Sequence, residues 1–590
     1  MNLARVSAPG RAAARLLELG LLCITPLVFY RGFSEQFTTI KLVLTEGIVL
    51  AGGVGLTLGL MWGGVRWPEG FRQTAPLGLL AIGVLVSCLT SPLPAFSLVE
   101  AQYFLCGPLW LLVLVSGRRG EARVQWLGAL VTAASAAMAG IALFQWAGYD
   151  PLQFGGYHVE WGTLRRAMRL YSTLGNPNFV AGYLIGAIFL ALALAATAQR
   201  TAVRILSAAA VLAIFVAILG TRSRGAWLGL AAGLGIARLL WKPPASTGNS
   251  SAALGDQAKV IPPTAWLPPV GLILLFPDLA QQVRALLSHL EGRLFLSRAS
   301  WPMFAEHPVL GNGWGMFQFR FPDLQAQFLS SHPEYVRYWT HTRQLHNDPL
   351  QILYEAGAVG FVAMGWVLWR YGRELREASS GSSRSSRVWL GASAGGVTAI
   401  LVDSLLNFQF AVPPTLILLF TLLALPFLLK ADDVVAAGAP EGNSRARLSL
   451  RIFGSGLVLG LAAFLALGIA RRAAGDRALA LGLEQERKGD ITRAEQHFRE
   501  GIERTPADGR LHYGLARALY VRGQHVEALT EVLRAEGTVA DSHLEVLRAR
   551  ILDQMGYAMP ALAAYRHALW LNPTLKSVPA DIDRLRSGHL

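Results

Sequence analysis

The chain alternates between long apolar stretches and short polar connections through its first 470 residues. A helix needs about 20 mainly apolar residues to cross a lipid bilayer. By that measure we place helices at 16–31, 40–62, 75–91, 97–116, 125–147, 178–198, 203–220, 225–241, 264–277, 347–370, 388–409, 412–430 and 450–470. The stretch at 264–277 is the shortest of these. The pattern predicts an all-α fold in which residues 1–470 form a polytopic membrane bundle of about 12 to 13 transmembrane helices.

The pattern changes after residue 475 to charged, alanine-rich, amphipathic segments. The triplets KGD (488–490), RGQ (522–524) and MGY (555–557) recur at spacings of 34 and 33 residues. This period resembles that of tetratricopeptide repeats, and three copies are about the minimum for a stable solenoid. We therefore predict a helical repeat domain at 471–590 that binds a protein partner. Its histidines are expected on helix surfaces: His497, His512, His525 and His567.

Composition supports a membrane protein and argues against nucleic-acid binding. Charged residues make up 15% of the chain and hydrophobic residues 53%, whereas soluble domains carry about 25% charged residues. Much of the net charge of +15 lies in short connections between apolar stretches, where positive charge sets membrane orientation. The three cysteines all lie inside apolar stretches, so no disulfide framework is predicted.

The positive-inside rule gives a topology with the N-terminus in the cytoplasm. Basic connections at 66–72, 117–123, 370–387 and 430–451 then lie inside. An odd number of crossings places the repeats outside. If 264–277 does not cross, Arg298 and His346 fall on the opposite side from Arg222 and Arg224.

Three outer segments break the charge rule: 148–177, the turn 221–225 and the long loop 278–345. Their arginines are Arg165, Arg166, Arg169, Arg222, Arg224, Arg284, Arg293, Arg298, Arg320, Arg337 and Arg343. A guanidinium pairs bidentately with phosphate oxygens. For most of these arginines, ion pairing with Asp or Glu, or contact with lipid headgroups, explains the charge better. Arg222 and Arg224 differ, because their turn contains no acidic residue, and they indicate an anionic ligand.

A second candidate feature is the segment HNDPLQILYEAGAVGF (346–361), which begins an apolar stretch. An ionisable residue at a membrane boundary is a functional hypothesis, and histidine titrates near physiological pH. Deeper in the bilayer, Asp403 and Asn407 are one helical turn apart and are predicted to form a polar contact.

Four motifs in order resemble the O-antigen ligase and polymerase superfamily over residues 75–425. They are LGNPNFVAGYL (174–184), TRSRGAWLG (221–229), SRASWPMFAEHPVLGNGWGMF (297–317) and HNDPLQILYEAGAVG (346–360). The last fits a ligase pattern of His, then Asn, nine residues, Gly, two residues and Gly. The resemblance implies glycosyl transfer on the outer face of the membrane, from an undecaprenyl-diphosphate-linked glycan.

The resemblance also assigns roles. Arg222, Arg224 and Arg298 would stabilise the leaving diphosphate, with Arg224 favoured because it matches the Ser-Arg-Gly motif. His346 would act as general base or orient the acceptor, while His332 and His341 are weaker rivals outside the pattern. The expected substrate-binding residues are Asn176, Asn178, Asn347 and Asp348; N-capping is the alternative role for Asn176 and Asn178. No cofactor is expected, and the reaction is predicted to be metal-independent.

The acceptor stays open at this level. Lipid A-core, as in lipopolysaccharide biosynthesis, is the first choice. A second glycan (polymerase) or a protein (oligosaccharyltransferase) are alternatives, and the repeats leave the choice undecided. A solute transporter would favour ionisable residues near the bilayer midplane, where Asp403 is the main example. A noncatalytic scaffold would leave the arginines and His346 without a role.

Overall fold

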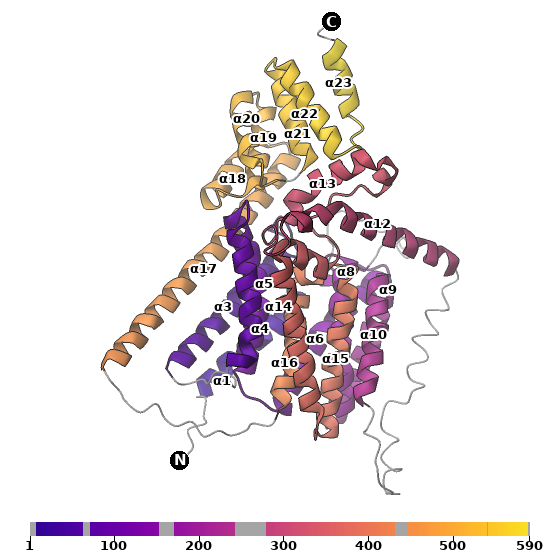
Figure 1. Ribbon diagram of the computed structural model, residues 1–590, viewed down its shortest axis with the longest axis vertical. Coiled ribbons are helices and arrows are strands. Elements are labelled where there is room, and N and C mark those ends of the chain that lie inside the picture. The colour runs from indigo at the N-terminus through magenta and orange to yellow at the C-terminus, as the bar shows by residue number, and fades with distance from the viewer. Residues whose placement is uncertain are drawn as a thin grey trace.

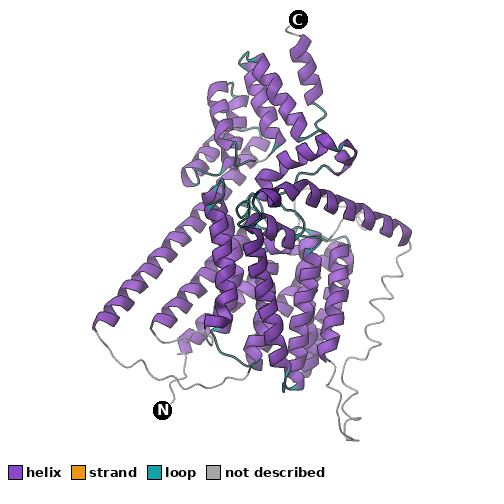
Figure 2. Ribbon diagram, in the orientation of Figure 1, coloured by secondary structure: helices purple, strands orange, loops and turns teal. Residues whose placement is uncertain are grey.

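A computed structural model describes residues 8–62, 71–152, 170–241, 279–430, 445–539 and 541–587. Within these ranges the chain is helical throughout and contains no strand (Figure 2). Long, roughly parallel helices form a bundle, and the C-terminal helices form a second layer stacked beyond one end of it (Figure 1). The all-α architecture predicted from the sequence is confirmed.

The predicted apolar stretches overlap described helices, except for 264–277, which lies outside the described residues. The first stretch overlaps the end of α1 (Ala8–Leu19) and includes a π-helical turn η1 (Gly20–Ile24) and α2 (Thr25–Leu27). The remaining bundle helices are α3 (Thr39–Met61), α4 (Phe71–Leu89), α5 (Pro94–Val115), α6 (Glu121–Trp146), α8 (Pro177–Thr197), α9 (Thr201–Thr221), α10 (Arg224–Trp241), α14 (Asp348–Ser379), α15 (Arg384–Ser404), α16 (Pro413–Leu429) and α17 (Arg445–Arg487).

Seven helices in the described part of the chain are both long and apolar enough to cross a membrane: α3, α5, α6, α8, α9, α14 and α17. Thr74–Leu89 and Pro413–Leu429 form shorter apolar helices. These helices indicate a multi-pass membrane protein. The larger total of 12 to 13 crossings stays a prediction.

The centre of the bundle is formed by α8 and α16, whose side chains are buried almost all round. Such uniformly apolar helices are typical of bundle interiors. The crossing of α10 and α15 is very close, since a Cβ on Gly229 would lie 2.4 Å from the carbonyl oxygen of Ala399. Small residues allow helix backbones to approach in this way. The tight crossing fixes the turn before α10 relative to the end of α15.

The segment 278–345, predicted as a long loop, is itself folded. It contains α12 (Leu279–Glu306), α13 (Phe317–Ser331) and the 3-10 helix η6 (Pro333–Tyr338). Phe295, Phe317 and Phe321 are fully buried in an apolar cluster between these elements. In Figure 1, α12 lies across the end of the bundle, between the membrane helices and the repeats.

The last bundle helix continues into the repeat region without a break. The helix α17 runs through residue 470, where the domain boundary was predicted. Along its apolar part Trp62 Nε1 donates a hydrogen bond to Ser455 Oγ at 3.0 Å. Beyond it, Arg472 forms an ion pair with Glu46 of α3. The first helix of the repeats is therefore also the last apolar helix.

The repeats continue as antiparallel helices: α18 (Ile491–Arg504), α19 (Gly509–Val521), α20 (His525–Ala535), α21 (Ser542–Gln554), α22 (Ala558–Leu571) and α23 (Val578–Ser587). Contrary to expectation, His512 is buried and bonds to Glu531 and to the Pro506 carbonyl. The array also contacts the segment over the bundle, where Trp339 Nε1 donates to the Leu571 carbonyl at 2.9 Å.

Candidate functional site

Residues 403–410 run from the last turn of α15 into its connection with α16 and join the motifs that the sequence singled out; they are called the 403–410 connection below. At its start, Asp403 accepts hydrogen bonds from Asn407 Nδ2 at 2.7 Å and from Gln409 Nε2 at 2.5 Å. All three side chains are buried. The predicted contact between Asp403 and Asn407 is confirmed, and Gln409 completes it.

The arginine turn lies against this connection. Its glycine, Gly225, is so close that an added Cβ would meet Asp403 Oδ1 at 2.5 Å and Asn407 Nδ2 at 3.0 Å. Arg222 ends α9 in a left-handed conformation with φ +56° and is exposed. Arg224 begins α10 and is half-buried. The turn that carries both arginines thus packs through Gly225 against the polar centre at Asp403.

His346, which lies just before the start of α14, contacts the same connection. Its ring lies edge-on to Phe408, with centroids 4.6 Å apart. Its backbone is left-handed, with φ +60°, a conformation that costs a non-glycine residue energy and clusters at functional sites. The buried Nδ1 of His346 has no hydrogen-bond partner among the described residues. The ring is therefore held by packing, with hydrogen-bonding capacity left for a ligand.

The two residues after His346 anchor the start of α14. Asn347 caps the helix by accepting from the Leu350 N–H at 3.0 Å, and donates to the Leu405 carbonyl at 3.1 Å. Asp348 is buried and accepts from the Phe410 N–H at 3.1 Å. Both side chains thus bind the 403–410 connection and hold His346 against it.

Asn176 and Asn178 approach Phe408 from α8. The Asn176 side chain caps α8 by accepting from the Asn178 N–H at 2.9 Å, which confirms the capping alternative for Asn176. The Asn178 carbonyl accepts from Gln409 Nε2 at 3.4 Å. The next residue, Phe179, packs on Phe408 with centroids 5.3 Å apart. Phe408 therefore lies between the start of α8 and His346.

The loop that leads into α8 is held by buried polar residues that the sequence analysis did not single out. Lys41 of α3 is buried and donates to the Thr173 carbonyl at 2.8 Å. Gln145 of α6 accepts from the Ser172 N–H at 2.9 Å. Two helices, α3 and α6, thus fix the approach of the Asn176–Asn178 segment.

Of Arg293 and Arg298, which both lie on α12, it is Arg293, and not Arg298, whose positive charge contributes to the pKa of His346. Burial lowers the pKa of His346 to about 3, and the positive charge of Arg293 contributes. Burial also lowers the pKa of Arg293 to about 10, partly offset by the charge of Asp403. Arg298 is exposed and donates to the Tyr335 hydroxyl at 3.1 Å. Five residues along a helix correspond to a rotation of about 140°, so the two arginines leave α12 in different directions.

The glycine-rich stretch 311–315 pairs with a kink in α14. Gly357 interrupts that helix with φ +64° and ψ −169°. There the Ala358 N–H donates to the Pro308 carbonyl at 2.8 Å, and the Gly313 N–H to the Glu355 carbonyl at 3.0 Å. Gly311, Gly313 and Gly315 all have positive φ. These glycines join the segment after α12 to α14 and so place Arg293 relative to His346.

The geometry also resolves the sidedness problem. Arg224 and His346 both neighbour the 403–410 connection, so they lie at one end of the bundle whatever the path of 264–277. At the other end, Trp241 Nε1 at the close of α10 donates to the Val388 carbonyl, near the start of α15, at 2.9 Å. The rival histidines His332 and His341 are exposed. Arg165, Arg166 and Arg169 lie outside the described residues.

No group of three or more His, Cys, Asp or Glu side chains in the described ranges is arranged to hold a metal ion. Metal independence stays a prediction. What the site offers is a neutral imidazole at His346 near the charge of Arg293, with the turn that carries Arg222 and Arg224 against the same 403–410 connection. These groups can stabilise developing negative charge and accept a proton.

Two family models match the chain. The O-antigen ligase model matches residues 208–365, which include Arg222, Arg224, Arg293 and His346. A tetratricopeptide repeat model matches residues 479–542. No protein with a curated description matches. The resemblance read from the motifs is confirmed, and the matched domain supports a membrane glycosyltransferase of the ligase or polymerase kind. The chain therefore contains one segment similar to the O-antigen ligase family and, C-terminal to it, one similar to a tetratricopeptide repeat.

Proposed function

We propose that this protein transfers a glycan from undecaprenyl diphosphate to an acceptor hydroxyl, with lipid A-core as the first choice of acceptor. The reaction would take place on the periplasmic face of the bacterial inner membrane. The observation that carries the proposal is the convergence of the arginine turn, Arg293 and His346 on the 403–410 connection.

In the proposed reaction the acceptor oxygen attacks the anomeric carbon of the donor, and the bond from that carbon to the diphosphate oxygen breaks. His346 takes the hydroxyl proton. The low pKa keeps the ring neutral at working pH, so a lone pair is available. The negative charge of a bound diphosphate would raise that pKa toward the range in which a general base is most effective. Arg222, Arg224 and Arg293 would offset the negative charge that develops on the diphosphate.

We propose Asn347 and Asp348 as positioning residues, since both side chains are engaged with the backbone of the 403–410 connection. Asn176 is also engaged, as the cap of α8. Asn178 is proposed to line the acceptor side of Phe408, because its neighbour Phe179 packs there. Arg298, which donates to Tyr335, would bind substrate at the outer edge of the segment over the bundle.

The test is an in vitro transfer assay with the purified full-length chain in lipid nanodiscs and a lipid-diphosphate-linked glycan. Separate arms offer lipid A-core, free glycan and protein as acceptor, each with and without a chelator. The variants are His346→Ala and Arg224→Ala. His332→Ala is the matched control, because His332 is exposed and lies outside the site.

Transfer by the wild type and His332→Ala, abolished in the other two variants, would support the proposal. The acceptor that receives the glycan then distinguishes a ligase from a polymerase and from a protein oligosaccharyltransferase. Loss of transfer with chelator would overturn metal independence. Full activity of His346→Ala would overturn the assignment of His346 as the base. If the folded protein transfers glycan to no acceptor, the solute-transporter interpretation is favoured instead.

A further inference from the structure

A groove lies between four helices at the end of the bundle away from His346. It is bounded by α4, α5, α14 and α16, has a cavity volume of about 30 Å³ and is partly open to the surroundings. Leu77, Leu111, Leu112, Leu423 and Phe427 contribute apolar walls. Arg370 of α14 lies about 30 Å along the helix from Asp348, which is close to the thickness of a bilayer core.

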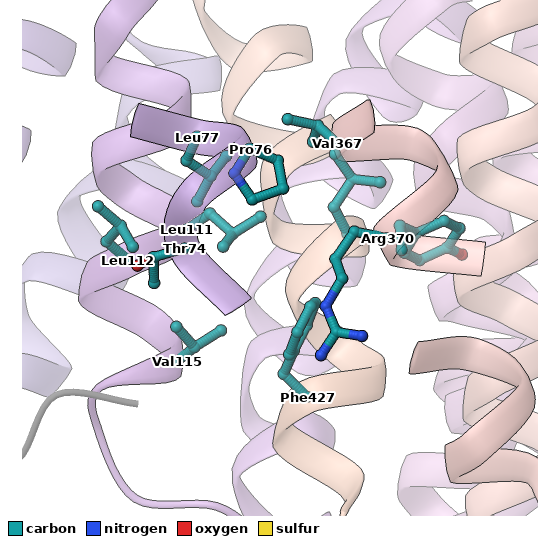
Figure 3. A pocket seen from close by; sticks show the side chains of 11 residues that line it. Thr74, Pro76, Leu77, Leu111, Leu112, Val115, Val367, Arg370 and Phe427 are labelled. Atoms are coloured by element: carbon teal, nitrogen blue, oxygen red, sulfur yellow. The ribbon is translucent and has the colours of Figure 1, made fainter. Parts of the chain in front are cut away.

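The groove contains one cation, Arg370, among its lining residues. Figure 3 shows this side chain reaching along the groove toward Phe427. Arg370 is only 9% exposed, and its Nη1 has no hydrogen-bond partner among the described residues. A buried donor without a partner is costly, and here it borders an apolar space. This arrangement points to a ligand with an acidic group and a hydrocarbon chain.

Neighbouring charges support an anionic group at this end. Arg370 pairs with Glu374, which also pairs with Lys430. Lys430 and Arg373 pair with Glu377 at 2.6 and 3.0 Å. These five side chains carry three positive and two negative charges, so they retain a net charge of +1. The excess favours a headgroup phosphate.

We propose that the groove binds an anionic phospholipid, with an acyl chain against Leu77 and Leu112 and the headgroup phosphate on Arg370. The polyprenyl chain of a donor is a weaker fit, because its charge would lie at the other end of the bundle, near Arg293. The bound lipid would join α4 to α14, the helix that begins beside His346.

The test is native mass spectrometry of the full-length chain released from membranes that hold phosphatidylglycerol and phosphatidylcholine with identical acyl chains. One charge-assisted hydrogen bond predicts about tenfold preferential retention of phosphatidylglycerol. Arg370→Gln removes the cation. Leu112→Phe narrows the groove and leaves every charge in place, which covers the case in which Arg370→Gln fails to fold. Arg204→Gln is the control, because Arg204 is exposed, does not line the groove and is not one of the five charged side chains.

Preference in the wild type and in Arg204→Gln, lost in Leu112→Phe and in any folded Arg370→Gln, supports the proposal. Equal retention of both lipids overturns it, as does preference that survives in Leu112→Phe. Displacement of phosphatidylglycerol by undecaprenyl phosphate would assign the groove to a polyprenyl chain instead and also overturn it.

Discussion

Gly225 meets Asp403 at a distance that leaves no room for a side chain, since a Cβ would lie 2.5 Å from Oδ1. Because Asp403 is itself bonded to Asn407 and Gln409, it has little freedom to move away. The contact therefore sets the distance between the arginine turn and the connection that carries Phe408.

We expect Gly225→Ala to displace Arg222 and Arg224 and to lower the transfer rate about 100-fold, because small misplacements of catalytic groups have effects of that order. The measurement is the rate of glycan transfer, with circular dichroism as a check on folding. Gly235→Ala is the control, since Gly235 is on the same helix and has open space around it. A wild-type rate in Gly225→Ala would contradict this account.

Arg293 and Arg298 should differ in effect when each is replaced by Gln. Removing one charge-stabilising donor from an active site typically lowers kcat about 100- to 1,000-fold, and we expect a loss of that order in Arg293→Gln. Arg298 is exposed and bonded to Tyr335, so Arg298→Gln should lower kcat less than about tenfold. The reverse order of effects would show that the charge of Arg293 is not used on the substrate.

His346 should give an unusual dependence of activity on pH. Its pKa of about 3 in the free protein keeps the imidazole neutral, so the acid limb of kcat/KM should lie below pH 5. A bound diphosphate adds negative charge and favours the imidazolium. The limb of kcat should therefore lie at higher pH than that of kcat/KM, measured between pH 4 and 8. If the acid limbs of kcat and kcat/KM lie at the same pH, the diphosphate does not bind close to His346.

The same pKa has a consequence for stability. The pKa of His346 in the folded state lies below the ordinary value of 6.5, so the unfolded chain binds the proton first. The stabilising contribution is complete above pH 6.5 and is lost as the pH falls toward 3. His346→Gln should weaken the loss of thermal stability over this window. If thermal stability falls with pH in His346→Gln as it does in the wild type, other groups cause the loss of stability in acid.

Gly357→Ala should destabilise the protein. Its φ and ψ of +64° and −169° lie in a region nearly exclusive to glycine, and strain there costs about 1–3 kcal/mol. The added Cβ would also lie 2.2 Å from the Val309 carbonyl oxygen. Thermal unfolding in nanodiscs is the measurement. Gly365→Ala, on the same helix in open space, should melt at the wild-type temperature; equal melting of both variants would mean that the kink is not required.

Sequence reasoning located the helices well, because the free energy of transfer into lipid depends on local apolar length. It failed at elements whose structure depends on partners. The segment 278–345 lacks long apolar stretches, and its helices form around a shared apolar cluster that includes Phe295 and Phe317. Phe317 is fully buried in that cluster.

The candidate site shows the same division. The sequence by itself determined the all-α architecture, the repeat period, and the residue types of the chemistry: arginines at Arg222 and Arg224 and a histidine at His346. Only the tertiary structure decided that residues 403–410 join them, that Arg293 rather than Arg298 acts on His346, and that both motifs lie at one end of the bundle. The physical reason is that direction around a helix and contact between distant segments depend on packing, which short-range sequence patterns do not encode.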